Sequence, residues 1–248
     1  MNYLKLKRFS HHLQVSFSRL NMICRSWYKL YAPDSLKHRR NTDQTKISDS
    51  SILAMLIWQA ELGIESQRRF CKFFVGLSHS RFNRRSRQLL PLIYLIRHVL
   101  NQEVDLSGKI LIMDSFPVPV CQPVRNYRVK IFHDMADIGY KATKKVYYYG
   151  FKVHAIVSDD GYLGKDLAFK LKQMGYKLWT PYRKNMQGAK EHNDHQPMAI
   201  RRTIESDFSL LSYYNAENNR ARSLTGFQER LEAAVLAYNM AYCLERFN

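Results

Sequence analysis

Three acidic residues that lie far apart in the sequence have the local settings that metal-dependent phosphate chemistry requires. Asp114 ends the apolar run KILIMD, and Asp159 follows the run HAIVS. Glu205 lies in MAIRRTIESDFSLL, where it borders an apolar stripe at helical spacing. Two carboxylates at strand ends and one on a helix can hold two Mg²⁺ ions about 3.5–4 Å apart. Such ions activate a water or a 3′-hydroxyl and stabilise the leaving oxygen.

Each of these acids also has an ordinary structural explanation when it is considered alone. Asp114 could cap a surface turn, and Asp159 begins Asp-Asp-Gly, which is typical of a turn. Glu205 could form a surface pair with Arg201, four residues earlier on the same helix. Only the combination of the three favours a shared metal site over these alternatives.

The charge of the chain favours a polyanionic partner. Its 248 residues include 39 Lys and Arg against 21 Asp and Glu, for a net charge of +18. Phosphate contacts use such an excess, so nucleic acid is the preferred partner over a ribosomal or membrane-surface role. The sequence has no apolar run of membrane-spanning length and no signal peptide, so a cytoplasmic, nucleoid-associated protein is expected. Its four cysteines are widely spaced, which favours reduced buried thiols over a zinc site.

The first part of the chain predicts short, closely connected helices. One begins at Ser48 or Asp49 and ends at Gly63, and a second covers residues 65–76. A third begins near Ser80 and is kinked or restarted at Pro91. Its basic first half suggests a helix-turn-helix-like module, although a helical bundle with a solvated basic face is the alternative. The DNA-binding candidates here are Arg81, Arg84 and Arg85.

Strands and helices alternate after residue 108, which predicts an α/β domain. One buried strand is expected to end at Asp114, and a second covers residues 146–158. Alternation in this second strand puts Tyr147 and Tyr149 on one face, where filling a half-buried sheet is favoured over stacking on bases. No second strand is expected after the Asp-Asp-Gly turn. A helix over 164–176, a short strand and two C-terminal helices follow.

Several blocks, in order, resemble a bacterial insertion-sequence transposase of the DDE type, similar to the family IS nine-eighty-two. They are DSFPVPVCQPVR, GYKATKKVYYYGFKVHAIVSDDGY, GYLGKDLAFKLKQMGYKLWTPYRKNM and RRTIESDFSLL followed by RARSLTGFQERLEAAVLAYNM. The resemblance covers nearly the whole chain. It implies an RNase H-like catalytic domain, Mg²⁺-dependent strand cleavage and transfer with Mn²⁺ as a possible substitute, and double-stranded DNA as partner. It also implies recognition of terminal repeats and a homo-oligomer when active.

When the motif blocks are matched to the family, the resemblance implies that the catalytic triad is Asp114, Asp159 and Glu205. The family pattern of Asp, any residue, Gly-Tyr-Leu-Gly selects Asp159 in DDGYLG, with Asp160 as the variable residue. Asp137 also begins an Asp-x-Gly-Tyr sequence, but its block matches the family segment before the second strand. Asp137 is therefore set aside.

The resemblance also indicates an internal deletion near residues 158–164. In a complete relative the first DGY leads into a third strand, a helix and a fourth strand that carries the second aspartate. Those elements need about 30–40 residues, and the 45 positions between Asp114 and Asp159 are already used. We expect a helical DNA-binding region at 1–105 and an RNase H-like domain at 106–248 that lacks two strands and a helix. This copy is expected to be weakly active or inactive; the alternative is a DNA-binding remnant without catalysis.

Further polar residues are secondary candidates. His133 and His154 are either partners of the metal ligands or ordinary satisfied polar groups. The remaining DNA-binding candidates, each with a solvated surface role as the alternative, are Arg183, Lys184, Arg220 and Arg222.

Overall fold

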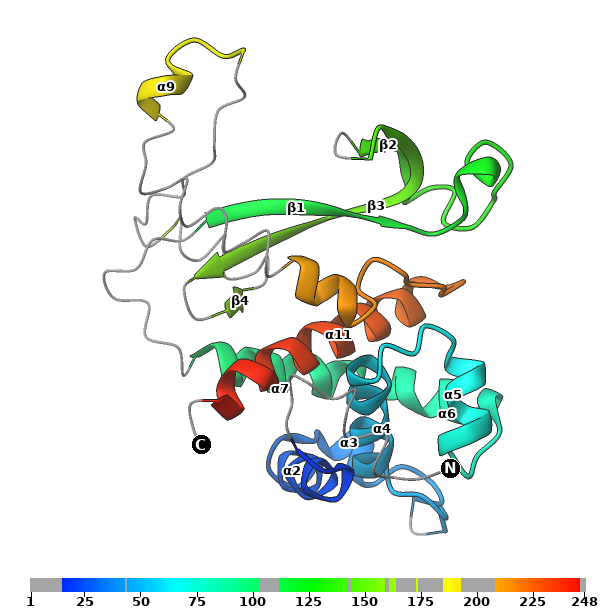
Figure 1. The fold of residues 1–248 in the computed structure, drawn as a ribbon. Coiled ribbons are helices and arrows are strands. Elements are labelled where there is room, and N and C mark those ends of the chain that lie inside the picture. The colour runs from blue at the N-terminus through cyan, green and yellow to red at the C-terminus, as the bar shows by residue number, and fades with distance from the viewer. Residues whose placement is uncertain are drawn as a thin grey trace.

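A layer of helices lies beside an antiparallel sheet, and the long C-terminal helix runs between them (Figure 1). The computed structural model describes residues 15–42, 44–102, 112–141, 144–158, 161–163, 173, 185–192 and 208–245. The C-terminal helix α11 (Leu224–Glu245) packs on helices α4, α6 and α7 and also contacts strand β4. This mixed α/β architecture agrees with the predicted fold class at the level of helices and sheet.

The N-terminal region consists of short helices, most of them separated by a few residues. Their bounds are α2 (Phe17–Tyr31), α3 (Asp34–Lys37), α4 (Asp49–Glu61), α5 (Gln67–Phe74), α6 (His79–Gln88) and α7 (Leu90–Gln102). The side chain of Ser48 accepts the backbone N–H of Ser51 at 3.1 Å, which caps α4. Gly63 follows α4 with a φ of +61°, a backbone conformation that glycine adopts without strain. Both predicted ends of this helix are confirmed.

Pro91 restarts the helix rather than kinking it. Helix α6 ends at Gln88, and α7 begins at Leu90 with Pro91 as its second residue. A proline fits there because the first N–H groups of a helix have no intrahelical acceptor. The apolar second half of the predicted helix is therefore α7, which buries Leu92, Ile93 and Ile96.

The sheet is built around one long strand. Strand β3 (Val146–Ser158) pairs antiparallel with β1 (Ile112–Pro119) and with β2 (Asp137–Lys141), in the order β1-β3-β2. The bounds of β3 are those predicted from the sequence. Strand β2, which contains the Asp-x-Gly-Tyr sequence at Asp137, was not predicted.

Two predictions about the strands are wrong. β1 does not end at Asp114 but continues through Pro117 to Pro119. Proline is tolerated because, among the described strands, β1 pairs with β3 alone, so one of its edges needs no N–H donors. A second strand does follow the Asp-Asp-Gly sequence: β4 (Gly161–Leu163) pairs with the end of β3, with Ser158 opposite Gly161. Residues 159–160, between the two strands, lie outside the described residues.

Aromatic side chains join one face of the sheet to the helices. The ring of Phe116 on β1 lies 5.2 Å from that of Phe208, which belongs to a helical segment at residues 208–213. The ring of Phe151 on β3 lies 4.5 Å from that of Phe227 on α11. One hydrophobic cluster therefore includes residues of the helical region, the sheet and α11.

The predicted border between residues 105 and 106 falls in the range 103–111, outside the described residues. The division into two domains stays a prediction, and the regions on either side of it share a core. Cys24 and Cys71 are buried and form no disulfide, as expected for reduced thiols. No helix in the described part of the chain is long and apolar enough to cross a membrane.

Gly150 is required where β1 and β3 pack most closely. A Cβ atom at this position would clash with the carbonyl oxygen of Val118 and lie 2.9 Å from Cα of Pro119. Backbone atoms cannot move aside as the end of a flexible side chain can. Gly150→Ala should therefore lower the free energy of unfolding by about 1–3 kcal/mol, measured by urea denaturation.

Gly76→Ala is the matched control, because the nearest atom to its added Cβ would be Cδ1 of Ile47 at 3.9 Å. That variant should stay within about 0.5 kcal/mol of the wild type. Equal denaturation midpoints for Gly150→Ala and the wild type would contradict the proposed close approach.

Candidate active site

Asp114 lies within a strand, on the face that meets the helices. It is the third residue of β1 and sits opposite Ala155 of β3. Successive side chains alternate across a strand, so Asp114 shares its face with the buried residues Phe116 and Val118. The half-buried Asp114 accepts the backbone N–H of Ser115 on Oδ1 at 2.7 Å.

The other oxygen of Asp114 has no side-chain partner in the part of the chain that the structure describes. Among the described residues, no side chain donates a hydrogen bond to it or forms an ion pair with it. The contrast is Asp49, whose carboxylate is held at 2.7 Å by Arg39 and at 2.6 Å by Arg85. Of these two sheltered carboxylates, Asp49 is paired with two arginines, whereas Asp114 has no basic partner among the described residues.

Glu205 lies outside the described residues, but the chain that follows it is well placed. Phe208, three residues later, contacts Phe116, and Phe116 lies two residues after Asp114 on the same face of β1. Leu211, the next member of the predicted apolar stripe, is fully buried. The segment after Glu205 therefore returns to the part of the sheet that carries Asp114.

Asp159 also lies outside the described residues, immediately after the last residue of β3. Ala155 is the partner of Asp114, and Ser158 lies three residues further along β3. At about 3.3 Å per residue, Ser158 is about 10 Å from the point opposite Asp114. The described residues contain no group of three or more His, Cys, Asp or Glu side chains that could hold a metal. Of the three predicted acids, the described residues include only Asp114.

The DNA-binding candidates on α6 divide into two kinds. Arg81 and Arg84 are exposed, whereas Arg85 is only 7% exposed. Arg85 donates to Asp49 at 2.6 Å and to the carbonyl oxygen of Ile47 at 2.6 Å. The head group of Arg85 joins α6 to the first turn of α4, and its role in DNA binding stays a prediction.

The same buried network includes a tyrosine. The hydroxyl of Tyr28 on α2 donates to Oδ2 of Asp49 at 3.4 Å. Burial and the nearby Asp49 carboxylate raise the pKa of Tyr28 above its usual value. Side chains of α2 and α6 thus both contact the Asp49 carboxylate of α4. These contacts stabilise the packing of the three helices.

The remaining predicted residues are scattered. Arg220 and Arg222 are exposed just before α11, and Arg220 pairs with Glu65. Arg183 and Lys184 lie outside the described residues. His133 is exposed beside Asp134, with its Nδ1 at 3.3 Å from a carboxylate oxygen, and half-buried His154 sits opposite Ser115 on the sheet.

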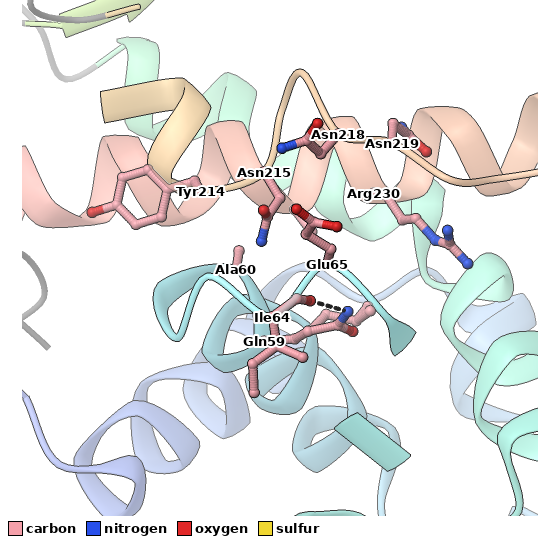
Figure 2. A pocket seen from close by; sticks show the side chains of 11 residues that line it. Gln59, Ala60, Ile64, Glu65, Tyr214, Asn215, Asn218, Asn219 and Arg230 are labelled. Atoms are coloured by element: carbon pink, nitrogen blue, oxygen red, sulfur yellow. Dashed lines mark hydrogen bonds between the residues drawn. The ribbon is translucent and has the colours of Figure 1, made fainter. Parts of the chain in front are cut away.

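A small pocket lies between the end of α4 and residues 214–219 (Figure 2). Its lining includes Gln59, Glu65, Asn215 and Arg230, and the Gln59 amide donates to the Ile64 carbonyl oxygen at 2.9 Å. None of the three predicted catalytic acids lines it. The pocket is therefore separate from the face of β1 that carries Asp114.

Sequence reasoning misplaced one aromatic residue. Tyr149 is buried as expected, but Tyr147 is 57% exposed, together with Tyr140 of β2. The short basic segment KATKK between them is the sequence signal that this end of the sheet is exposed to solvent.

Comparison with known families bears on the strands that surround Asp114. Residues 105–161 match a family model described as Transposase DDE domain. These residues are similar to a transposase DDE domain. Such a domain is a polynucleotidyl transferase by family, and it implies a DNA transposase. Searches of curated proteins and of solved structures gave no match.

The transposase DDE domain match contains Asp114, the catalytic candidate that the structure describes, together with all of β1, β2 and β3. Enzymes of this type generally use divalent metal ions. The antiparallel β1–β3 ladder is thus the part of the chain where family and geometry agree.

Arg85 and Arg84 provide a matched test of structural and DNA-binding arginines. Arg85→Ala should cost about 3–5 kcal/mol of unfolding free energy, because it leaves Asp49 buried with one partner fewer. Arg84→Ala, one residue away and exposed, should change stability by less than about 0.5 kcal/mol and weaken DNA binding. Urea denaturation and fluorescence anisotropy with labelled DNA check the pair. A stable Arg85→Ala protein with weakened DNA binding would reverse this assignment.

Proposed function

We propose that this chain is an insertion-sequence transposase, similar to the family IS nine-eighty-two, that binds the element's terminal repeats. Its chemistry is Mg²⁺-dependent DNA strand cleavage and strand transfer, with Mn²⁺ as a substitute. Asp114 and Glu205 are the principal metal ligands, and Asp159 is the second aspartate by motif. The observation that carries the proposal is the Asp114 carboxylate inside the matched DDE segment, on the sheet face that contacts Phe208.

The residues present fit a divalent metal ion. The half-buried Asp114 carboxylate, one oxygen of which has no partner among the described residues, is a hard ligand of the kind Mg²⁺ prefers. Bound Mg²⁺ would lower the pKa of an attacking water or 3′-hydroxyl and stabilise the leaving oxygen. In this proposal β1 holds Asp114 on a paired strand, and the Phe116–Phe208 contact brings the segment that follows Glu205 to the same face of the sheet.

Two observations support an internal deletion near residues 158–164. The family match ends at residue 161, inside the junction expected from the motif blocks. Asp159 also follows a strand position about 10 Å from the point opposite Asp114, whereas metal ions in two-metal sites are about 3.5–4 Å apart. A misplacement of even about 1 Å can cost on the order of 100-fold in rate. We therefore infer that this copy is weakly active or inactive.

The charge distribution supports double-stranded DNA as the partner. The net charge of +18 already counts Asp49, Glu232 and Glu217, each of which pairs with a basic residue within the fold. Exposed Arg81 and Arg84 on α6 and Arg222 before α11 remain as phosphate contacts, and Arg183 and Lys184 remain proposals from the sequence. Arg220 contributes if DNA displaces its exposed pairing with Glu65. We also propose that the protein acts as a homo-oligomer on paired DNA ends in the bacterial cytoplasm.

A second candidate function is a DNA-binding remnant without catalysis. The same deletion favours it, because the helical region and its exposed arginines lie outside the affected segment. The two candidates differ in whether any strand cleavage depends on Asp114.

Asp114→Asn should reduce Mg²⁺-dependent cleavage of element-end DNA by at least about 100-fold, with DNA affinity unchanged. Because the expected rate is low, cleavage is followed under single-turnover conditions with excess protein. Asp137→Asn is the matched control: Asp137 also lies in a strand of the sheet and accepts its neighbour's N–H at 2.7 Å. It should leave cleavage unchanged.

Cleavage that Asp114→Asn does not reduce would contradict the proposed site. DNA binding without cleavage by the wild type would favour the remnant. Turnover comparable to that of a full-length relative would contradict the inferred impairment.

A further inference from the structure

The β2–β3 hairpin carries two exposed aromatic rings near its tip. Tyr140 and Tyr147 are direct partners in the ladder, and their ring centroids lie 5.0 Å apart. They are 53% and 57% exposed. Large aromatic rings left together in water form a surface that gains free energy when a flat apolar partner covers them.

The exposure of these rings follows from how the neighbouring residues are covered. Tyr149, on the same face as Tyr147, is buried beneath the connection that follows β1, and its hydroxyl donates to the carbonyl oxygen of Ile131 at 3.0 Å. Asn126 fixes this connection by donating to the Tyr147 carbonyl oxygen at 2.9 Å and accepting the Tyr149 N–H at 3.1 Å. The fixed connection covers Tyr149 and leaves Tyr147 and Tyr140 open.

On the opposite face, the hairpin is closed. The ring of Tyr148 lies against Gly139, where an added Cβ would sit 2.6 Å from Cζ of Tyr148. Tyr148 is buried, so the three consecutive tyrosines have different roles. The glycine in the Asp-Ile-Gly-Tyr sequence thus has a packing role in the hairpin.

Positive charge surrounds the exposed pair. The exposed basic residues of the hairpin turn and of the connection that follows β1 are Arg125, Arg128, Lys130, Lys144 and Lys145. Asp134 and Asp137 are the exposed acids described between residues 120 and 150. Lys141 is held by Glu217 at 3.0 Å, which fixes the hairpin to the segment before α11. The partner must therefore be negatively charged and offer flat apolar faces.

We propose that this aromatic–basic tip, formed by Tyr140, Tyr147, Lys144 and Lys145, binds a DNA strand with unpaired bases, which stack on the two tyrosines. The inference rests on the proposed function and adds a second DNA contact, near the hairpin tip and far from Asp114 along β3. Nucleic acid supplies both phosphates and aromatic base faces, whereas a second copy of this chain would bring a further charge of +18. Unpaired bases are required because in intact duplex the base faces are covered by their neighbours.

The tip lies well away from Asp114. Tyr147 is eight residues from Ala155, the partner of Asp114, so the two positions are separated by about 25 Å along β3. The binding of unpaired DNA at the tip can therefore be measured without the catalytic site.

The test is fluorescence anisotropy with a labelled single strand and with a blunt duplex of the same length, without divalent metal. The double variant Tyr140→Ala/Tyr147→Ala should weaken single-strand binding about 10- to 100-fold and duplex binding less than about 3-fold. Tyr140→Phe/Tyr147→Phe should restore single-strand binding to within about 3-fold of the wild type, because stacking needs the ring and not the hydroxyl. Phe73→Ala, which removes an exposed aromatic ring from α5, is the matched control and should change neither affinity.

A second pair of variants tests the phosphate contacts. Lys144→Gln/Lys145→Gln should reduce the slope of log affinity against log salt for the single strand by about 1.4, because each contact to a single strand contributes about 0.7. An unchanged slope would overturn the assignment of these lysines.

Equal single-strand affinity for the wild type and the double alanine variant would overturn the proposal, as would an equal loss for single strand and duplex. Neither binding measurement depends on Asp114. If cleavage proved independent of Asp114, the single-strand binding by the tip could therefore still be observed. Conversely, a tip that binds no unpaired DNA would leave the dependence of cleavage on Asp114 unaffected.

Discussion

The packing of one sheet face against the C-terminal helices is the interaction on which the rest of the structure depends. Phe116 and Phe151 lie on that face, and Phe208 and Phe227 meet them from the helices at ring separations of 5.2 and 4.5 Å. Aromatic pairs of this kind stabilise by more than the area they bury. These contacts hold the β1–β3 ladder on a helical body in which α11 packs against α4, α6 and α7. The same contacts give Asp114 its sheltered position, because it lies on the face that the helices cover.

Charge in this protein has two different uses. Inside the fold, Asp49 gathers Arg39 and Arg85, and Glu232 holds Arg97 at 2.6 Å, so several basic residues stabilise contacts between helices. Outside it, basic side chains without such partners provide the field that attracts a polyanion. Net charge therefore indicates the class of partner, but only the burial of each arginine distinguishes the two uses.

Local signals in the sequence predicted much of the fold. The Ser48 cap, the end of α4 at Gly63, the restart at Pro91 and the bounds of β3 all follow from capping, proline and alternation rules that act over a few residues. Most features that the sequence did not predict have a different origin, since they depend on a partner distant in the sequence. β1 extends past Asp114 because β3 pairs with it, and Arg85 is buried because Asp49 lies beneath it. The missed strand β4 is different, because it pairs locally with the end of β3. Tyr147 is exposed because the covering connection stops at Tyr149, which no periodicity in β3 could indicate.

The most direct test of this account asks whether the segment that carries Glu205 lies over Asp114. A benzophenone amino acid placed at position 114 is irradiated in the folded protein, and the cross-linked peptides are identified by mass spectrometry. The account predicts intramolecular cross-links to the peptide around residues 201–211, because Phe208 already contacts Phe116 on the same face of β1. Cross-links confined to the helices α2–α7, in a protein with native circular dichroism, would show that the two acids face different parts of the molecule and would contradict the shared metal site.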